Sequence, residues 1–431
     1  MEGTDKRPFG FWTATALVVG GMIGAGIFVQ PAQLAPFGWT GMMAWFIAVP
    51  AAMLLAYVLS KLTAARPGST GMIEIVGDAL GPMPGVLVGW SYWVGIISAN
   101  AIIALTAVRY LAEFVPGLTA TPLATALAAT ALIWALTLLN LGGARGAGRF
   151  QVLTTVLKLL PLVAVVLIVG GLVFTDPATF ARHAQAPFKA RQLTTALTLA
   201  FFPLVGFESA SLAAERVRDP ARNVLRATLF GTALTGALYI VICNGIVLAM
   251  PPAEVAASDA PVALFVQNFW GRGAGLAVAA FAAISAIGCL NCWVLMQGEV
   301  PLGMARAGLL PAFIARTSAR DVPTAAILFS TVLGSALVMC GALPGLTGVL
   351  TFMLQLTTAA TVWLYAGATL AALKLGIVRG PAVIGLLAAG WVLWGSGMEP
   401  LLLSIALMLT AVPLYWLRPR PSQVKTAAAS G

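Results

Sequence analysis

The chain has 431 residues, of which 60% are hydrophobic and only 9% are charged. Soluble domains carry about 25% charged residues, so the composition excludes a soluble protein. It predicts an all-α, multi-pass membrane protein whose surroundings are the lipid bilayer. The net charge of +10 would also fit nucleic-acid binding. The basic residues, however, fall mostly in short loops between apolar segments, as membrane topology requires, and we expect no nucleic-acid partner.

Twelve apolar segments are candidates for membrane spans, because about 20 apolar residues cross the hydrocarbon core as a helix. Two further segments, 71–80 and 299–315, are predicted to lie at the membrane surface. The twelve predicted spans are 10–34, 39–62, 84–115, 122–141, 150–174, 192–214, 224–250, 262–297, 324–342, 346–373, 381–397 and 400–417.

The distribution of Lys and Arg predicts the orientation of the chain. With the first residues in the cytoplasm, 18 of the 24 basic residues fall on the inner side. Cytoplasmic loops are enriched in Lys and Arg, so we expect both termini in the cytoplasm and the protein in the cell (inner) membrane. The basic residues on the outer side would be Arg182, Lys189, Arg191 and Arg272.

The first predicted span is unusual because Gly20, Gly21, Gly24 and Gly26 crowd its centre. Each glycine costs up to about 1 kcal/mol relative to alanine inside a helix. Interrupted backbone at membrane depth is tolerated where it lines a cavity or is buried in protein, and transporters use such breaks to bind substrate. Close helix packing through small residues is the alternative.

The sixth predicted span is also interrupted, at Pro203 and Gly206, and Glu208 follows directly. Helices one and six lie five spans apart and run in opposite directions in the topology above. This pattern predicts two inverted units of five helices with a binding site at their interface. The expected divisions are a cytoplasmic N-terminus at 1–8, repeats at 9–190 and 191–374, two further helices at 375–417 and a disordered cytoplasmic tail at 418–431.

Three motifs resemble the amino acid–polyamine–organocation superfamily of transporters: Gly-Met-Ile-Gly-Ala-Gly-Ile-Phe at 21–28, Gly-Phe-Glu-Ser-Ala-Ser at 206–211 and Asp-Pro-Ala-Arg-Asn-Val at 219–224. Within it the chain looks most like the basic amino acid/polyamine antiporters, such as the arginine/agmatine antiporters. The resemblance implies the leucine-transporter fold, with about 12 transmembrane helices arranged as five plus five inverted and two more, helices one and six being broken. It also implies transport by alternating access.

The resemblance implies the site residues as well. The substrate-binding set would be Met22, Ala25, Gly26, Gly95, Ile96, Asn100, Phe202, Val205, Trp293 and Thr357, and the gating or coupling set Tyr92, Glu208, Tyr365 and Lys158. The chain departs from the arginine/agmatine pattern at Phe202, where those antiporters carry Trp, and at Ala25, where they carry a hydroxyl. Lys158 departs too, and resembles sodium-independent transporters whose ammonium stands where relatives hold a metal ion.

Several of these residues also have structural explanations. A charged side chain near the centre of a membrane helix is costly and is treated as functional by default, but Glu208 and Lys158 could simply pair with each other. Phe202 could be a core aromatic, and Asn100 could bond a neighbouring helix. Arg109 and Glu113, four residues apart, are expected to form a local ion pair.

We therefore predict a secondary active transporter that exchanges a cationic amino acid for its decarboxylated amine or another amino acid. A proton-coupled, sodium-independent transporter of neutral amino acids is the alternative. An enzyme would need clustered titratable groups inside the spans, and a channel would need a continuous polar pore. We expect no cofactor and no metal site, since Cys289 and Cys292 read as small buried residues. Protons and a second copy of the chain are further candidate partners.

Overall fold

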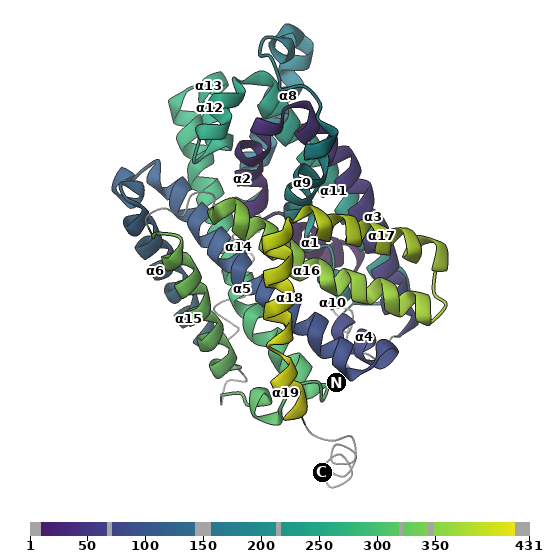
Figure 1. Cartoon of the computed structure of the whole chain (residues 1–431). Helices are drawn as coiled ribbons and strands as arrows, with labels where there is room; N and C mark the ends of the chain where they lie inside the picture. Colours follow the sequence, from purple (N-terminus) through teal and green to yellow (C-terminus); the bar gives the residue numbers. More distant parts are fainter. Residues whose placement is uncertain are drawn as a thin grey trace, which may run out of the picture.

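The computed structural model describes residues 10–66, 71–142, 157–212, 217–318, 322–343 and 349–418, and its regular elements there are all helices (Figure 1). The first half contains α1 (Phe11–Met22), α2 (Ala25–Leu34), η1 (Ala35–Phe37), α3 (Trp39–Ala65), α4 (Met72–Leu80), α5 (Pro82–Ala112), η2 (Pro116–Thr119), α6 (Pro122–Leu141), α8 (Leu160–Thr175) and η3 (Pro177–Ala181).

The second half begins with the segments that replace one continuous sixth helix. It contains α9 (Ala190–Phe201), η4 (Phe202–Leu204), α10 (Ser209–Leu212), α11 (Pro220–Ala249), α12 (Pro252–Ala257), α13 (Pro261–Trp270), α14 (Arg272–Arg306), η6 (Ala312–Ala315), α15 (Thr324–Cys340), α16 (Val349–Lys374), α17 (Arg379–Gly395), α18 (Met398–Leu409) and α19 (Val412–Trp416).

Seven helical segments in the described ranges are long and apolar enough to cross a membrane: α3, α5, α6, α11, α14, α16 and α18 with α19. The bent pair α1 and α2 adds an eighth if it is one span, whereas α8 and α15 are apolar but shorter. The all-helical membrane architecture agrees with the prediction. The count of twelve spans and the inverted repeat stay predictions.

The predicted span 262–297 was wrong at both ends. Gly271, with a φ of +86°, separates α13 from α14, and α14 then continues to Arg306. The helix extends because its residues stay buried beyond position 297, including Val300, Leu302 and Met304. Pro301 lies within this stretch. The segment predicted as a separate surface piece at 299–315 is therefore the last part of α14 followed by η6.

Helix α5 lies at the centre of the bundle and packs mainly against α14 and α16, while α3 packs against α11 and α9. Figure 1 shows α12 and α13 at one end of the helical body and α19 at the other; we name these the α13 end and the α19 end. Large apolar side chains such as Leu167, Leu387 and Trp394 are exposed on the periphery. Such exposure is unfavourable in water and is accommodated by lipid.

Candidate functional site

The first helix is broken where the glycines predicted it. Helix α1 ends at Met22, α2 begins at Ala25, and the two are bent by 44°. Ile23 has extended backbone between them, with φ −74° and ψ 93°. A break of this kind leaves carbonyl groups at the end of α1 and N–H groups at the start of α2 without helical partners.

The carbonyl groups at the end of α1 are bonded by side chains from two other parts of the chain, the turn before α8 and helix α11. The ammonium of Lys158 donates to the main-chain oxygens of Gly20 at 2.7 Å and Ile23 at 3.3 Å. The hydroxyl of Tyr239 on α11 donates to the oxygen of Met22 at 2.8 Å. A helix C-terminus carries partial negative charge, so a cation is electrostatically matched to this position. Sequence reasoning missed Tyr239, whose contact joins residues 217 positions apart.

The predicted sixth helix is interrupted between Phe201 and Ser209. Helix α9 ends at Phe201, η4 follows as one tight turn, and α10 begins at Ser209. Between them Gly206 has a φ of +115°, which favours glycine because a side chain is strained there. A Cβ atom at Gly206 would also lie 2.7 Å from the main-chain oxygen of Gly21. The two breaks are therefore in direct contact, and their approach depends on glycine.

A cavity lies beside the two breaks. It contains nine of the ten predicted substrate-binding residues together with Tyr92. Its lining consists of Gly21, Met22, Gly24, Ala25, Gly26, Tyr92, Gly95, Ile96, Ala99, Ile103, Phe202, Pro203, Val205, Cys289, Trp293, Thr357 and Thr361. Helices α5, α14 and α16 thus supply the walls opposite the breaks. The assignment of these residues to substrate binding remains a proposal.

Some lining residues were not predicted, although helical periodicity contains the signal. Ala99 and Ile103 lie three and seven residues after Ile96, on the same face of α5. Cys289 precedes Trp293 by one turn, and Thr361 follows Thr357 by one turn. Residues three or four apart share a helix face. The family motif therefore identifies the face of each helix that lines the cavity, and the helical period of 3.6 residues indicates which further residues lie on that face.

Asn100 is the one predicted binding residue that does not belong to the lining of this cavity. It is 1% exposed, and its amide donates a 2.7 Å hydrogen bond to Oε1 of Gln297 on α14. Although Asn100 lies four residues after the cavity residue Ile96, this bond directs its amide toward α14. This geometry matches the alternative, in which Asn100 bonds a neighbouring helix.

The chemical character of the lining is apolar and aromatic with isolated hydroxyls. No charged side chain belongs to the lining, which is drawn entirely from the described part of the chain. Within that part, Oγ1 of Thr357 is buried and has no hydrogen-bond partner. Buried polar atoms are normally paired, so Thr357 is positioned to bond a molecule in the cavity.

Glu208 is not part of the cavity lining, and its side chain is buried, with 1% exposed. Its Oε1 accepts a hydrogen bond from the hydroxyl of Tyr92 at 2.9 Å, and its Oε2 accepts one from Tyr365 at 2.7 Å. The main-chain N–H of Gly206 donates to Oε2 at 3.0 Å. Tyr92, Tyr365 and Glu208, predicted as one gating group, are thus brought together, with Tyr92 between the carboxylate and the cavity.

Two ion pairs that the sequence analysis considered, one expected and one as an alternative, do not form between the described residues. Glu208 and Lys158 bond separate partners, so the simple structural pair does not form. Arg109 does not pair with Glu113 on its own helix. Its Nη1 instead lies 3.3 Å from Oδ1 of Asp259, between α12 and α13. The tertiary partner replaces the local one because the α12–α13 connection packs beside α5 at the α13 end.

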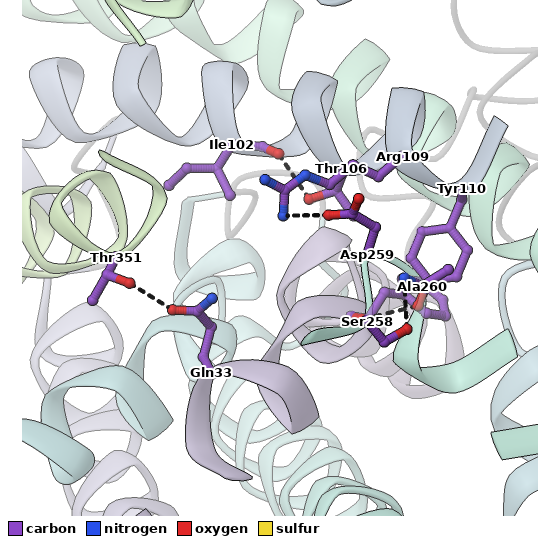
Figure 2. A network of polar contacts seen from close by, with 10 residues as sticks. Gln33, Ile102, Thr106, Arg109, Tyr110, Ser258, Asp259, Ala260 and Thr351 are labelled. Carbon is purple, nitrogen blue, oxygen red and sulfur yellow. Dashed lines mark hydrogen bonds and ion pairs between the residues drawn. The ribbon is translucent and has the colours of Figure 1, made fainter. Parts of the chain in front are cut away.

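Figure 2 shows the polar contacts around this ion pair. The hydroxyl of Thr351 on α16 donates to Oε1 of Gln33 on α2 at 2.8 Å. The hydroxyl of Tyr110 on α5 donates to the main-chain oxygen of Phe28 at 2.9 Å. Helix α2 is therefore tied to both α16 and α5 at the α13 end.

The chain is similar in sequence to several known proteins. A family model described as "Amino acid permease" matches residues 9–425. The cadaverine/lysine antiporter of Escherichia coli (strain K12) is 30% identical over 78% of this chain and 75% of its own length. The putrescine transporter PotE of Haemophilus influenzae is 29% identical over 77% and 76%. PotE of Escherichia coli (strain K12) is 27% identical over 97% of both chains.

Proposed function

Because the chain belongs to the amino acid permease family, we propose that it is a secondary active antiporter of amino acids and amines. Membership confirms the family predicted from the three motifs and makes the chain a membrane transporter rather than an enzyme. In the finer proposal, a cationic amino acid is exchanged for its decarboxylated amine or another amino acid. The main observation behind the proposed transport activity is the cavity beside two broken helices, an arrangement that supports alternating access.

The first break supplies groups for an amino-acid backbone. The N-cap residue Gly24 has no side chain to cap the start of α2, although the N–H of Ala25 faces the thiol of Cys289. A helix N-terminus favours an anion, and we assign the substrate carboxylate to Ala25 and Gly26. At the opposing end of α1, the substrate ammonium would share the partial negative charge with the ammonium of Lys158, which already bonds the oxygens of Gly20 and Ile23. Trp293 and Phe202 would cover the side chain, since aromatic faces attract cations.

We assign coupling to Glu208 and a fixed charge to Lys158. A buried carboxylate held by two hydroxyls on different helices responds to a proton or to a cationic substrate, because either changes its electrostatic energy. The Lys158 ammonium would stabilise the end of α1 as a bound metal ion would. Tyr92 and Tyr365 then act as a gate, because moving α5 or α16 away breaks a bond to Glu208.

A specific observation favours the alternative of a proton-coupled, sodium-independent transporter of neutral amino acids. The cavity lining contains no charged side chain, and Glu208 is screened from it by Tyr92. An uncharged substrate side chain would need no carboxylate in the lining. Transport of cationic substrates would instead require Tyr92 to move and expose Glu208.

We place the protein in the cell (inner) membrane with its α19 end facing the cytoplasm, because the Lys and Arg bias of the loops favours this orientation. The twelve-span inverted repeat belongs to the same proposal. A homodimer is compatible with this arrangement and would leave each cavity complete within one chain.

Counterflow in liposomes tests the proposed function. Vesicles containing the purified protein are preloaded with unlabelled lysine, arginine, cadaverine, agmatine, putrescine or leucine, and uptake of labelled lysine or leucine is followed. Lysine uptake driven by lysine or cadaverine inside supports the exchanger. Leucine uptake driven by leucine and by an inward proton gradient, without lysine uptake, supports the alternative. No uptake under any loading would contradict both.

A further inference from the structure

A second pocket lies at the α13 end, further along the helices that wall the central cavity. Arg109 follows the cavity residue Ile103 by six positions on α5, which is about 9 Å along the helix axis. Leu350 precedes Thr357 by seven positions on α16, or about 10.5 Å. The pocket therefore lies nearer the α13 end than the cavity does, beside the same two helices.

The pocket holds one charge of each sign. Nη1 of Arg109 and Oδ1 of Asp259 are 3.3 Å apart, and their side chains are 30% and 59% exposed (Figure 2). Exposed ion pairs contribute little to stability. A ligand with two charges of its own could therefore replace this pair at small cost. An amino acid brings a carboxylate that matches the guanidinium, which bonds carboxylates in a bidentate manner, and an ammonium that matches Asp259.

The pocket also borders a hydrogen bond between α2 and α16. Gln33 on α2 lines the pocket and accepts the hydrogen bond from Thr351 on α16. Helix α2 is the segment after the first break, so a ligand here would touch a helix that also lines the central cavity. The charge pair and this hydrogen bond border the same pocket.

We infer that this pocket is a docking site at which an amino acid is held before it enters the central cavity. Its carboxylate pairs with Arg109 and its ammonium with Asp259. An amine without a carboxylate docks through Asp259 alone. The inference rests on the proposed function, and on the proposed orientation with the α13 end outside.

Neutralising Arg109 and neutralising Asp259 should affect the uptake of lysine and of cadaverine differently. Initial uptake of labelled lysine and labelled cadaverine is measured in intact cells that express the full chain, because such cells expose only the outer face. Arg109→Gln should raise the KM for lysine roughly three- to tenfold, the loss expected for one charge-assisted hydrogen bond in a partly exposed pocket. It should not raise the KM for cadaverine, because the variant leaves Asp259 free to bind the amine. Asp259→Asn should raise both. Glu113→Gln is the control, since Glu113 is exposed at the same end of α5 but does not line the pocket.

The outcomes separate docking from a simple latch. If the ion pair only holds the end closed, Arg109→Gln and Asp259→Asn change the uptake of both substrates equally, and the docking site is wrong. Unchanged KM values in both variants would also overturn it. Absence of uptake of either substrate by the wild-type protein would overturn the exchange of cationic substrates, and this inference with it. The lysine-selective effect of Arg109→Gln supports docking.

Discussion

The hydroxyl of Tyr365 on α16 donates a 2.7 Å hydrogen bond to Oε2 of Glu208, the buried carboxylate that follows the second helix break. Tyr92 on α5 donates to the other carboxylate oxygen at 2.9 Å. One carboxylate thus joins three elements around the cavity. Hydrogen bonds to charged groups contribute about 1.5–3 kcal/mol each. The protonation state of this carboxylate therefore changes the free energy of any movement that separates the elements.

We predict that Glu208→Gln flattens the pH dependence of transport. Glutamine has a similar shape but takes up no proton over the physiological range. Initial rates of exchange are measured from acidic to neutral pH in the variant and the wild type. Glu113→Gln, at an exposed position, should keep the wild-type profile. A Glu208→Gln profile identical to wild type would remove Glu208 from coupling.

We predict that Lys158→Ala slows exchange more than it weakens substrate binding. The variant leaves the oxygens of Gly20 and Ile23 without their donor, which costs about 1–3 kcal/mol for a buried unpaired group. Substrate affinity and exchange rate are measured on the same preparation. Equal losses in both would place Lys158 at the substrate instead of at the end of α1.

The separate partners of Lys158 and Glu208 give a further prediction. A mutually dependent buried pair would recover stability when both members are removed. Here each residue bonds its own groups, so the double variant Lys158→Ala with Glu208→Gln should be no more stable than either single variant. Unfolding is followed for all three proteins in detergent. Recovery in the double variant would mean that the two charges depend on each other.

Trp293 and Asn100 were predicted in the same binding set, and the structure separates them. We expect Trp293→Ala to raise the dissociation constant of a cationic substrate roughly tenfold, as the loss of a desolvated cation–π contact would. We expect Asn100→Ala to leave affinity unchanged and to lower stability by about 1–3 kcal/mol, because Oε1 of Gln297 loses its donor. Binding titrations and thermal unfolding of both variants check this. The reverse pattern would restore Asn100 to the site.

The sequence predicted the all-helical class, the family and both helix breaks, because glycine and proline mark breaks locally. Gly206 is the clearest example, since its positive φ and close approach to Gly21 both need a missing side chain. The faces of α5, α14 and α16 also followed from motifs and periodicity. These signals depend only on residues near one another in the chain.

The remaining features depend on contacts between distant residues. Nothing near Arg109 in the sequence indicates Asp259, 150 positions away, and a local partner in Glu113 was the natural expectation. Tyr239 and Met22 are likewise joined only by the packing of α11 on α1. The end of α14 was misplaced because Val300 and Leu302, which lie beyond the predicted end at 297, stay buried in the packed helix.

Counterflow by a Gly26 variant tests most directly whether the cavity beside the two breaks carries the substrate. A Cβ atom at Gly26 would lie 2.6 Å from Cβ of Pro203, so Gly26→Val fills the contact between the breaks. Gly170→Val is the control, since a Cβ atom there meets nothing within 4 Å. We predict that vesicles preloaded with lysine take up labelled lysine through the wild type and Gly170→Val but not through a folded Gly26→Val. Uptake by Gly26→Val at the wild-type rate would contradict the account.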